Sequence, residues 1–252
     1  MRFGTLVDTN KRNILANNLA AVRQRIDAAC ANAGRDANEV VLVGVSKTIP
    51  AEDIEAAFSL GVRHFGENYL DEALQKVQLL GSTGERALGT PNDRPEWHFI
   101  GRIQSNKTRQ IAAHFDWVHT VEREKIARRL SEQCPANKLI NVLLQINIDN
   151  APAKAGVGAA DAPMLLDAIC GLPNLAPRGL MTILARSEST ANARASYGLM
   201  AQLAAELGDR LPATKRDAWD TLSMGMTGDL EAAIDAGATH VRIGTALFGA
   251  RD

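Results

Sequence analysis

Apolar runs alternate along this chain with segments whose apolar residues recur at helical spacing. The first run, residues 40–45, has no polar alternation, which is typical of a strand buried on both faces of a parallel sheet. Ahead of it, Leu15, Leu19 and Val22 recur at spacings of three or four. This spacing predicts an amphipathic helix over residues 11–33.

The same alternation continues through the rest of the sequence. Further strands are predicted over residues 64–68, 96–101, 117–121, 139–148, 179–183, 221–225 and 240–245, and helices over 51–60, 70–80, 106–113, 122–133, 162–170, 190–207 and 229–236, with a Gly/Pro-rich loop over 81–95. Eight strands alternating with helices predict an α/β fold, a single closed (β/α)8 barrel with an extra N-terminal helix. An open doubly wound sheet is the alternative.

The chain has 252 residues, and barrels of this kind typically have about 250. We therefore expect one domain over residues 1–252, with about residues 1–10 as an N-terminal tail; two small domains would also suit this length. Because 28 basic residues balance 29 acidic ones, no overall basic field favours nucleic acid or an anionic membrane.

Compartment and assembly follow from what the sequence lacks. We find no apolar segment long enough to span a bilayer and no signal-peptide core, so we expect a cytoplasmic protein. Three widely spaced cysteines suit a reducing compartment. No His, Cys, Asp or Glu group has metal-ligand spacing, so no metal site is expected. No heptad pattern indicates self-association, and we expect a monomer.

The first buried strand leads directly to Lys47. A lysine held at the mouth of an apolar strand loses hydration, which lowers its pKa and makes its amine a nucleophile toward carbonyls. The alternative is that Lys47 marks the point where the strand reaches solvent. In a barrel, the end of the first strand adjoins that of the eighth, so Lys47 is expected within one or two strand spacings of residues 223–225 and 244–245.

These last two segments resemble phosphate-binding turns. Ser223, Gly225 and Thr227 stand just before a predicted helix, and Gly244 and Thr245 follow the eighth strand. Free backbone N–H groups at helix N-termini attract anions, and barrels often bind phosphate between these two turns. Each turn could instead serve only helix capping or a tight bend. Together with Lys47, they indicate a phosphorylated aldehyde as ligand.

Several short motifs, in their order and spacing, closely resemble the YggS/PROSC family of pyridoxal phosphate homeostasis proteins. They are Gly44-Val45-Ser46-Lys47-Thr48, Phe65-Gly66-Glu67-Asn68-Tyr69, Trp97-His98-Phe99-Ile100-Gly101, Gln104-Ser105-Asn106-Lys107, Gly179-Leu180-Met181, Ser223-Met224-Gly225-Met226 and Val241-Arg242-Ile243-Gly244-Thr245-Ala246-Leu247-Phe248-Gly249. The resemblance runs from the first helix to the last strand, and it implies a fold similar to the N-terminal barrel of alanine racemase.

The resemblance also implies a role for each site residue. Lys47 would hold pyridoxal 5′-phosphate (PLP) as a Schiff base, and Asn68 would lie close to the ring oxygen. Arg242 would face the pyridine nitrogen. The phosphate would be taken by Ser223, Gly225, Gly244 and Thr245, with Met224 nearby. Thr227 stands where the family usually has serine, and Lys154 lacks the acidic residue expected before it, which leaves its role open.

The resemblance implies a PLP carrier or regulator, with an indirect effect on amino-acid and keto-acid balance, rather than an enzyme. Racemisation on PLP needs an acid/base on each face of the cofactor, and in alanine racemase one is a tyrosine from a second, β-rich domain. Tyr69 and Tyr197 fall at or inside predicted helices, and only four residues follow Phe248. We therefore expect no tyrosine acid/base on the second face of the cofactor.

A single-domain amino-acid racemase and a cofactor-free Schiff-base aldolase that uses Lys47 directly are the alternatives to a carrier. Apo-forms of PLP enzymes are candidate partners. Direct handover to them and simple buffering of free cofactor predict the same site.

Overall fold

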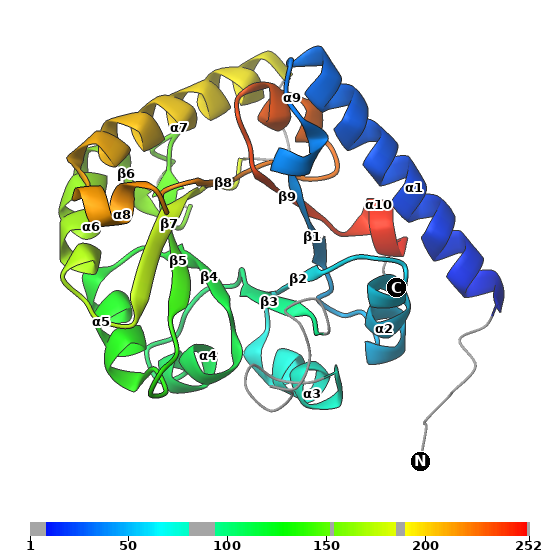
Figure 1. Ribbon diagram of the computed structural model, residues 1–252, viewed down its shortest axis with the longest axis horizontal. Helices are drawn as coiled ribbons and strands as arrows, with labels where there is room; N and C mark the ends of the chain where they lie inside the picture. Colours follow the sequence, from blue (N-terminus) through cyan, green and yellow to red (C-terminus); the bar gives the residue numbers. More distant parts are fainter. Residues whose placement is uncertain (1–8, 81–93, 152–153, 185–189, 251–252) are drawn as a thin grey trace.

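In the computed structural model of this protein, which describes residues 9–80, 94–151, 154–184 and 190–250, eight parallel strands close into a barrel surrounded by helices (Figure 1). The strands are β1 (Val41–Val45), β2 (His64–Glu67), β3 (Glu96–Phe99), β4 (Trp117–Val121), β5 (Ile140–Asn147), β7 (Leu175–Met181), β8 (Thr221–Ser223) and β9 (His240–Ile243). Their order around the barrel is β4-β3-β2-β1-β9-β8-β7-β5, and pairing of β4 with β5 closes it. The closed barrel is confirmed, and the open sheet is excluded.

Helices cover the outside of the barrel. They are α1 (Thr9–Asn32), α2 (Ala51–Ser59), α3 (Leu70–Leu80), α4 (Thr108–His114), α5 (Glu124–Gln133), α6 (Ala162–Cys170), α7 (Thr190–Arg210), α8 (Ala213–Arg216), α9 (Leu230–Asp235) and α10 (Thr245–Phe248). The extra helix α1 lies along α9, α10 and α2 (Figure 1), with Leu15, Leu19 and Val22 buried as expected. Across the described ranges, none of these helices is long and apolar enough to cross a membrane.

The strand predicted over residues 179–183 was misplaced. The actual strand, β7, begins at Leu175 and contains Pro177, which normally interrupts a ladder. Pro177 is accommodated because the pairing with β5 shifts register at this point. Gly179 has φ +148°, and a Cβ there would lie 1.8 Å from the carbonyl oxygen of Thr221, so only glycine fits.

Short elements were not predicted. They include α8, α10 and the two-residue strand β6 (Val157–Gly158), which pairs with the end of β5. Most of the predicted loop over 81–95 and most of the tail over 1–10 lie outside the described residues.

The two faces of the barrel sheet pack differently. Phe65, Trp97 and Val118 point outward and belong to the large apolar core between sheet and helices. Inside the barrel, Trp117 packs with Leu143 and Met181, and the remaining space holds several buried polar side chains: His98, His119, Ser223, His240 and Arg242. The barrel axis is therefore polar along much of its length.

Candidate functional site

The carboxyl end of the barrel brings the predicted ligand residues to neighbouring strands. β1 lies between β2 and β9, with Val45 opposite Gly66 and Gly44 opposite Ile243. Lys47, Asn68 and Gly244 each follow their strand by one or two residues. Since adjacent strands are ~4.8 Å apart, these residues surround one small area at this end of the barrel.

The loop after β8 joins the same area. Ser223 is the last residue of β8, the backbone N–H of Met224 donates to the carbonyl of His240 (3.1 Å), and that of Arg242 donates to the carbonyl of Gly225 (3.0 Å). The segment 223–225 therefore runs beside β9. The sequence-predicted set thus converges on four consecutive strands: β8, β9, β1 and β2.

A buried ion network fixes the backbone just before Lys47. Glu67 is fully buried and Lys76 is 5% exposed. The Lys76 ammonium donates to Glu67 Oε1 (2.8 Å) and to the carbonyl oxygen of Ser46 (2.7 Å), and the Ser46 hydroxyl donates to Glu67 Oε1 (2.6 Å). Burial raises the pKa of Glu67, while the Lys76 ammonium opposes that rise.

The same network fixes the backbone just after Lys47. Glu72 Oε1 accepts from the backbone N–H of Thr48 (2.5 Å) and from Lys76 Nζ (2.5 Å). Thr48 has φ +62°, a conformation that a β-branched residue adopts only under outside constraint. Lys47 therefore lies in a short strained turn, and both flanking residues are tied to α3.

Asn68 presents a polar atom to this end of the barrel. Its Oδ1 is buried and has no hydrogen-bond partner among the described residues. A Cβ on Gly101 would lie 2.0 Å from the carbonyl oxygen of Asn68, so close backbone packing positions Asn68. Next to it, a cavity of about 460 Å³ is lined by residues that include Asn68, Tyr69 and Lys107.

Tyr197 and Asp229 hold the loop after β8 in place. The Tyr197 hydroxyl donates to Asp229 Oδ2 (2.7 Å), and Asp229 Oδ1 accepts from the backbone N–H of Met226 (2.6 Å). Burial and the Asp229 carboxylate raise the pKa of Tyr197, so the phenol stays protonated and acts as a clamp.

Tyr197→Phe should loosen this loop while the aromatic ring keeps its place in the core. Loss of the hydroxyl removes one charge-assisted hydrogen bond and should lower the free energy of unfolding by about 1–3 kcal/mol. Urea unfolding measures this loss. Inorganic phosphate should also protect the variant less against thermal unfolding than it protects the wild type. Equal protection of both proteins would show that the clamp does not shape an anion site.

Two sequence-predicted residues lie deeper than expected. The Ser223 hydroxyl is buried inside the barrel, where it bonds His119 Nδ1 (2.9 Å) and accepts from Arg242 (2.7 Å). The Met224 side chain is fully buried in the apolar core. Only the backbone groups of Ser223 and Met224 could therefore contact a phosphate, and both assignments remain predictions. Gly225 is buried with φ +91°, whereas Thr245 is exposed.

Arg242 ends a polar chain that crosses the barrel. Its guanidinium donates to Ser223 and to the carbonyl of Thr182 (2.8 Å). His119 Nε2 lies 2.8 Å from His98 Nδ1. Burial lowers the pKa of both histidines well below the usual value and also lowers that of Arg242. Both imidazoles are therefore neutral, as expected for satisfied interior histidines.

Sequence reasoning missed Glu67, Glu72, Lys76 and Tyr197. Glu72 and Lys76 stand four apart in α3, which resembles an ordinary surface pair; the apolar neighbours of Lys76 were the available signal. Lys154, whose role was left open, forms an ion pair with Asp149 in the loop after β5.

Comparison with known proteins identifies the family of this chain. The family model for the alanine racemase N-terminal domain matches residues 17–252. A protein of Pseudomonas aeruginosa named pyridoxal phosphate homeostasis protein is 50% identical over 240 residues, covering 94% of this chain and 96% of its own.

Two solved structures are similar in fold. A protein of unknown function from Bifidobacterium adolescentis has a TM-score of 0.85 at 31% identity, with 96% of this chain and 98% of that chain covered. PipY of Synechococcus elongatus, solved with PLP bound, has a TM-score of 0.76 at 33% identity, with 93% and 100% covered. The chain therefore belongs to the family of pyridoxal phosphate homeostasis proteins, built on the alanine racemase N-terminal barrel.

Proposed function

We propose that this protein binds PLP at the carboxyl end of its barrel, with Lys47 forming a Schiff base to the cofactor aldehyde, and that it serves intracellular PLP homeostasis. The observation that carries the proposal is the convergence of Lys47, Asn68, the loop 223–225 and Gly244–Thr245 on four adjacent strands. PipY, whose fold this chain shares, has been solved with PLP bound.

The chemistry of these residues suits the cofactor. The orphan Oδ1 of Asn68 would find a polar partner in the ring substituents. Ser223 and Met224, through their backbone, with Gly225, Gly244 and Thr245, would surround the phosphate, where helix N-termini favour an anion. Arg242 would face the pyridine nitrogen; a guanidinium can donate to it but disfavours its protonation. The bound ring would then be a weak electron sink.

This arrangement favours a carrier over a racemase. A racemase needs an acid/base group on each face of the ring. Tyr69 is 57% exposed at the start of α3, and the Tyr197 hydroxyl is committed to Asp229. With both tyrosines so placed, we infer a protein that holds and releases cofactor. We further propose that it acts in the cytoplasm as a monomer, with apo-forms of PLP enzymes as recipients.

Two measurements on the PLP-loaded protein test this function. Loaded protein in D₂O with an amino acid should exchange the α-proton no faster than free PLP does. Mixed with an apo-enzyme that needs PLP, it should restore activity. Restoration faster than release into buffer alone would indicate handover, whereas restoration at the release rate would indicate buffering. Rapid proton exchange that depends on Lys47 would overturn the carrier in favour of an enzyme.

A further inference from the structure

Three potential metal ligands meet at the amino-terminal mouth of the barrel, opposite Lys47. Glu96 and His98 stand two apart on β3, so both side chains point to the same face of the sheet. His64 lies on β2 directly opposite Glu96. Two residues from one strand and one from its neighbour thus bring three donors together, although their spacing along the chain shows no metal motif.

The distances between the donor atoms suit a metal ion. His64 Nδ1 lies 3.0 Å from His98 Nε2 and 3.4 Å from Glu96 Oε2, and donor atoms of the three residues all lie within 4.8 Å of one another. In a tetrahedral zinc site with bonds of about 2.0–2.1 Å, ligand atoms are separated by roughly 3.3 Å. Small side-chain adjustments would place an ion between them.

Second contacts orient these ligands. His98 Nδ1 lies 2.8 Å from His119 Nε2. In the tautomer with its proton on Nδ1, His98 donates to His119 and keeps the lone pair of Nε2 for the ion. Trp117 Nε1 donates to Glu96 Oε2 (3.0 Å). Metal-binding histidines and carboxylates are usually held by such outer hydrogen bonds.

A further imidazole, that of His240, stands beside the cluster, and its Nδ1 lies 3.2 Å from the Thr239 hydroxyl oxygen. His240, 6% exposed, has a buried Nε2 without a hydrogen-bond partner among the described residues. Its ring centre lies 6.0 Å from that of His98 and 6.4 Å from that of His64. The mouth of the barrel therefore holds more nitrogen donors than its hydrogen bonds require.

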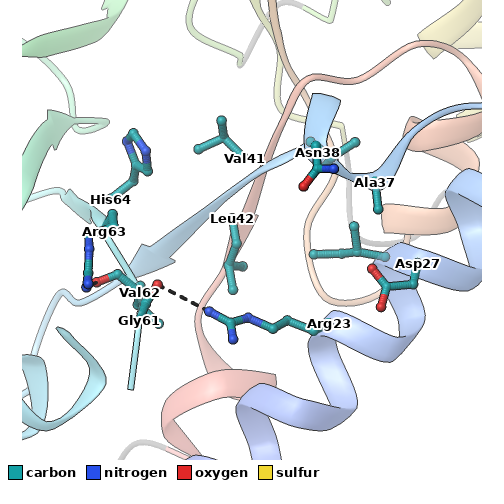
Figure 2. Close-up of a pocket in the computed structure, with 12 residues that line it drawn as sticks. Arg23, Asp27, Ala37, Asn38, Val41, Leu42, Gly61, Val62, Arg63 and His64 are labelled. Carbon is teal, nitrogen blue, oxygen red and sulfur yellow. Dashed lines mark hydrogen bonds between the residues drawn. The ribbon is translucent and has the colours of Figure 1, made fainter. Parts of the chain in front are cut away.

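Solvent reaches the cluster from one side. The side chains of His64 and Glu96 are 24% and 38% exposed, whereas His98 is fully buried. His64 lines a cavity of about 330 Å³ together with Arg23, Asp27 and Arg63 (Figure 2). Glu96 and His98 do not line this cavity. The entry path and the room for water as a fourth ligand therefore lie on the exposed side of His64 and Glu96.

We propose that His64, Glu96 and His98 form a binding site for a divalent transition-metal ion of the zinc class at the amino-terminal mouth of the barrel. Two imidazoles and one carboxylate with an open position are a ligand set that Zn²⁺ accepts. The site lies at the other end of the barrel from Lys47, so it does not depend on the proposed cofactor function.

Titration of tag-free, chelator-treated protein with Zn²⁺ and Co²⁺ tests the proposal. Calorimetry should show a single Zn²⁺ per chain, and Co²⁺ should give the visible bands of a nitrogen- and oxygen-bound ion. His64→Gln and Glu96→Gln, both at partly exposed positions, should each weaken binding by more than about tenfold. His114→Gln, in α4 and outside the cluster, is the matched control and should bind like wild type.

Far-ultraviolet circular dichroism and PLP binding check that the variants are folded. If folded His64→Gln and Glu96→Gln bind Zn²⁺ as tightly as wild type, or if wild type binds none, the metal site is wrong and the cluster is a hydrogen-bonded chain only. If His114→Gln loses binding to the same extent as the two ligand variants, the proposed ligands are likewise wrong.

Discussion

Lys76→Met is expected to lower the free energy of unfolding by about 3–5 kcal/mol, because it leaves a fully buried carboxylate without its cation. The methionine keeps the volume of the side chain but loses three hydrogen bonds, to Glu67, Glu72 and the carbonyl of Ser46. Since Ser46 precedes Lys47, the turn that carries Lys47 should also loosen. PLP affinity should therefore fall together with stability.

The cost of Lys76→Met should depend on pH in a definite direction. Burial already raises the pKa of Glu67 above its ordinary value of 4.5, and loss of the ammonium should raise it further. The Glu67 carboxyl then binds its proton more tightly in the folded state than in the unfolded state. The free energy of unfolding therefore falls as pH rises above about 4.5. The loss measured by urea unfolding should be larger at pH 8 than at pH 5.

Two further variants make this prediction specific. Glu67→Gln combined with Lys76→Met removes the stranded charge and should recover part of the lost stability, with little pH dependence left. Lys125→Met, at an exposed position in α5, should change stability by no more than about 0.5 kcal/mol. If Lys76→Met lowers the free energy of unfolding no more than this control does, the buried network does not hold the turn.

Gly225→Ala is expected to lower both the stability of the protein and its affinity for PLP. The residue has φ +91°, and a Cβ there would lie 2.5 Å from the Cβ of Ala233 in α9. Backbone strain alone should cost about 1–3 kcal/mol, and relief of the contact would move the loop away from α9. Both stability and affinity for PLP should therefore fall, the latter because the phosphate would meet a displaced loop.

Gly198→Ala is the matched control. Gly198 lies in α7 with nothing within 4 Å of its added Cβ, so alanine should stabilise the helix by up to about 1 kcal/mol. Fluorescence titration with PLP should separate the two variants. Unchanged PLP affinity in a folded Gly225→Ala protein would remove this loop from the proposed phosphate site.

The barrel could be predicted from sequence because its signals are local. Apolar runs such as residues 40–45 alternate with helical spacing, and closure of eight strands then places β1 beside β9. That one step brings Lys47 and Gly244 to the same end of the barrel. Pro177 concealed the start of β7, because the register shift that tolerates it depends on the partner strand.

The supports of the site could not be predicted in the same way. Lys76 and Glu72 resemble a solvated i, i+4 pair until α3 is packed against the turn after β1. His98 and His119 come from separate strands, and each reads as an isolated interior histidine. Their contact exists only because the closed barrel points both rings inward. Tertiary contacts of this kind leave no periodicity in the sequence.

Borohydride trapping tests the central claim most directly. PLP-loaded protein, reduced with borohydride and digested with protease, should carry the reduced pyridoxyl group on the peptide that contains Lys47, as mass spectrometry would show. Lys47→Ala should lose both this label and the visible absorption band. A label on another lysine, such as Lys154, or a wild-type band that persists in Lys47→Ala, would contradict the account.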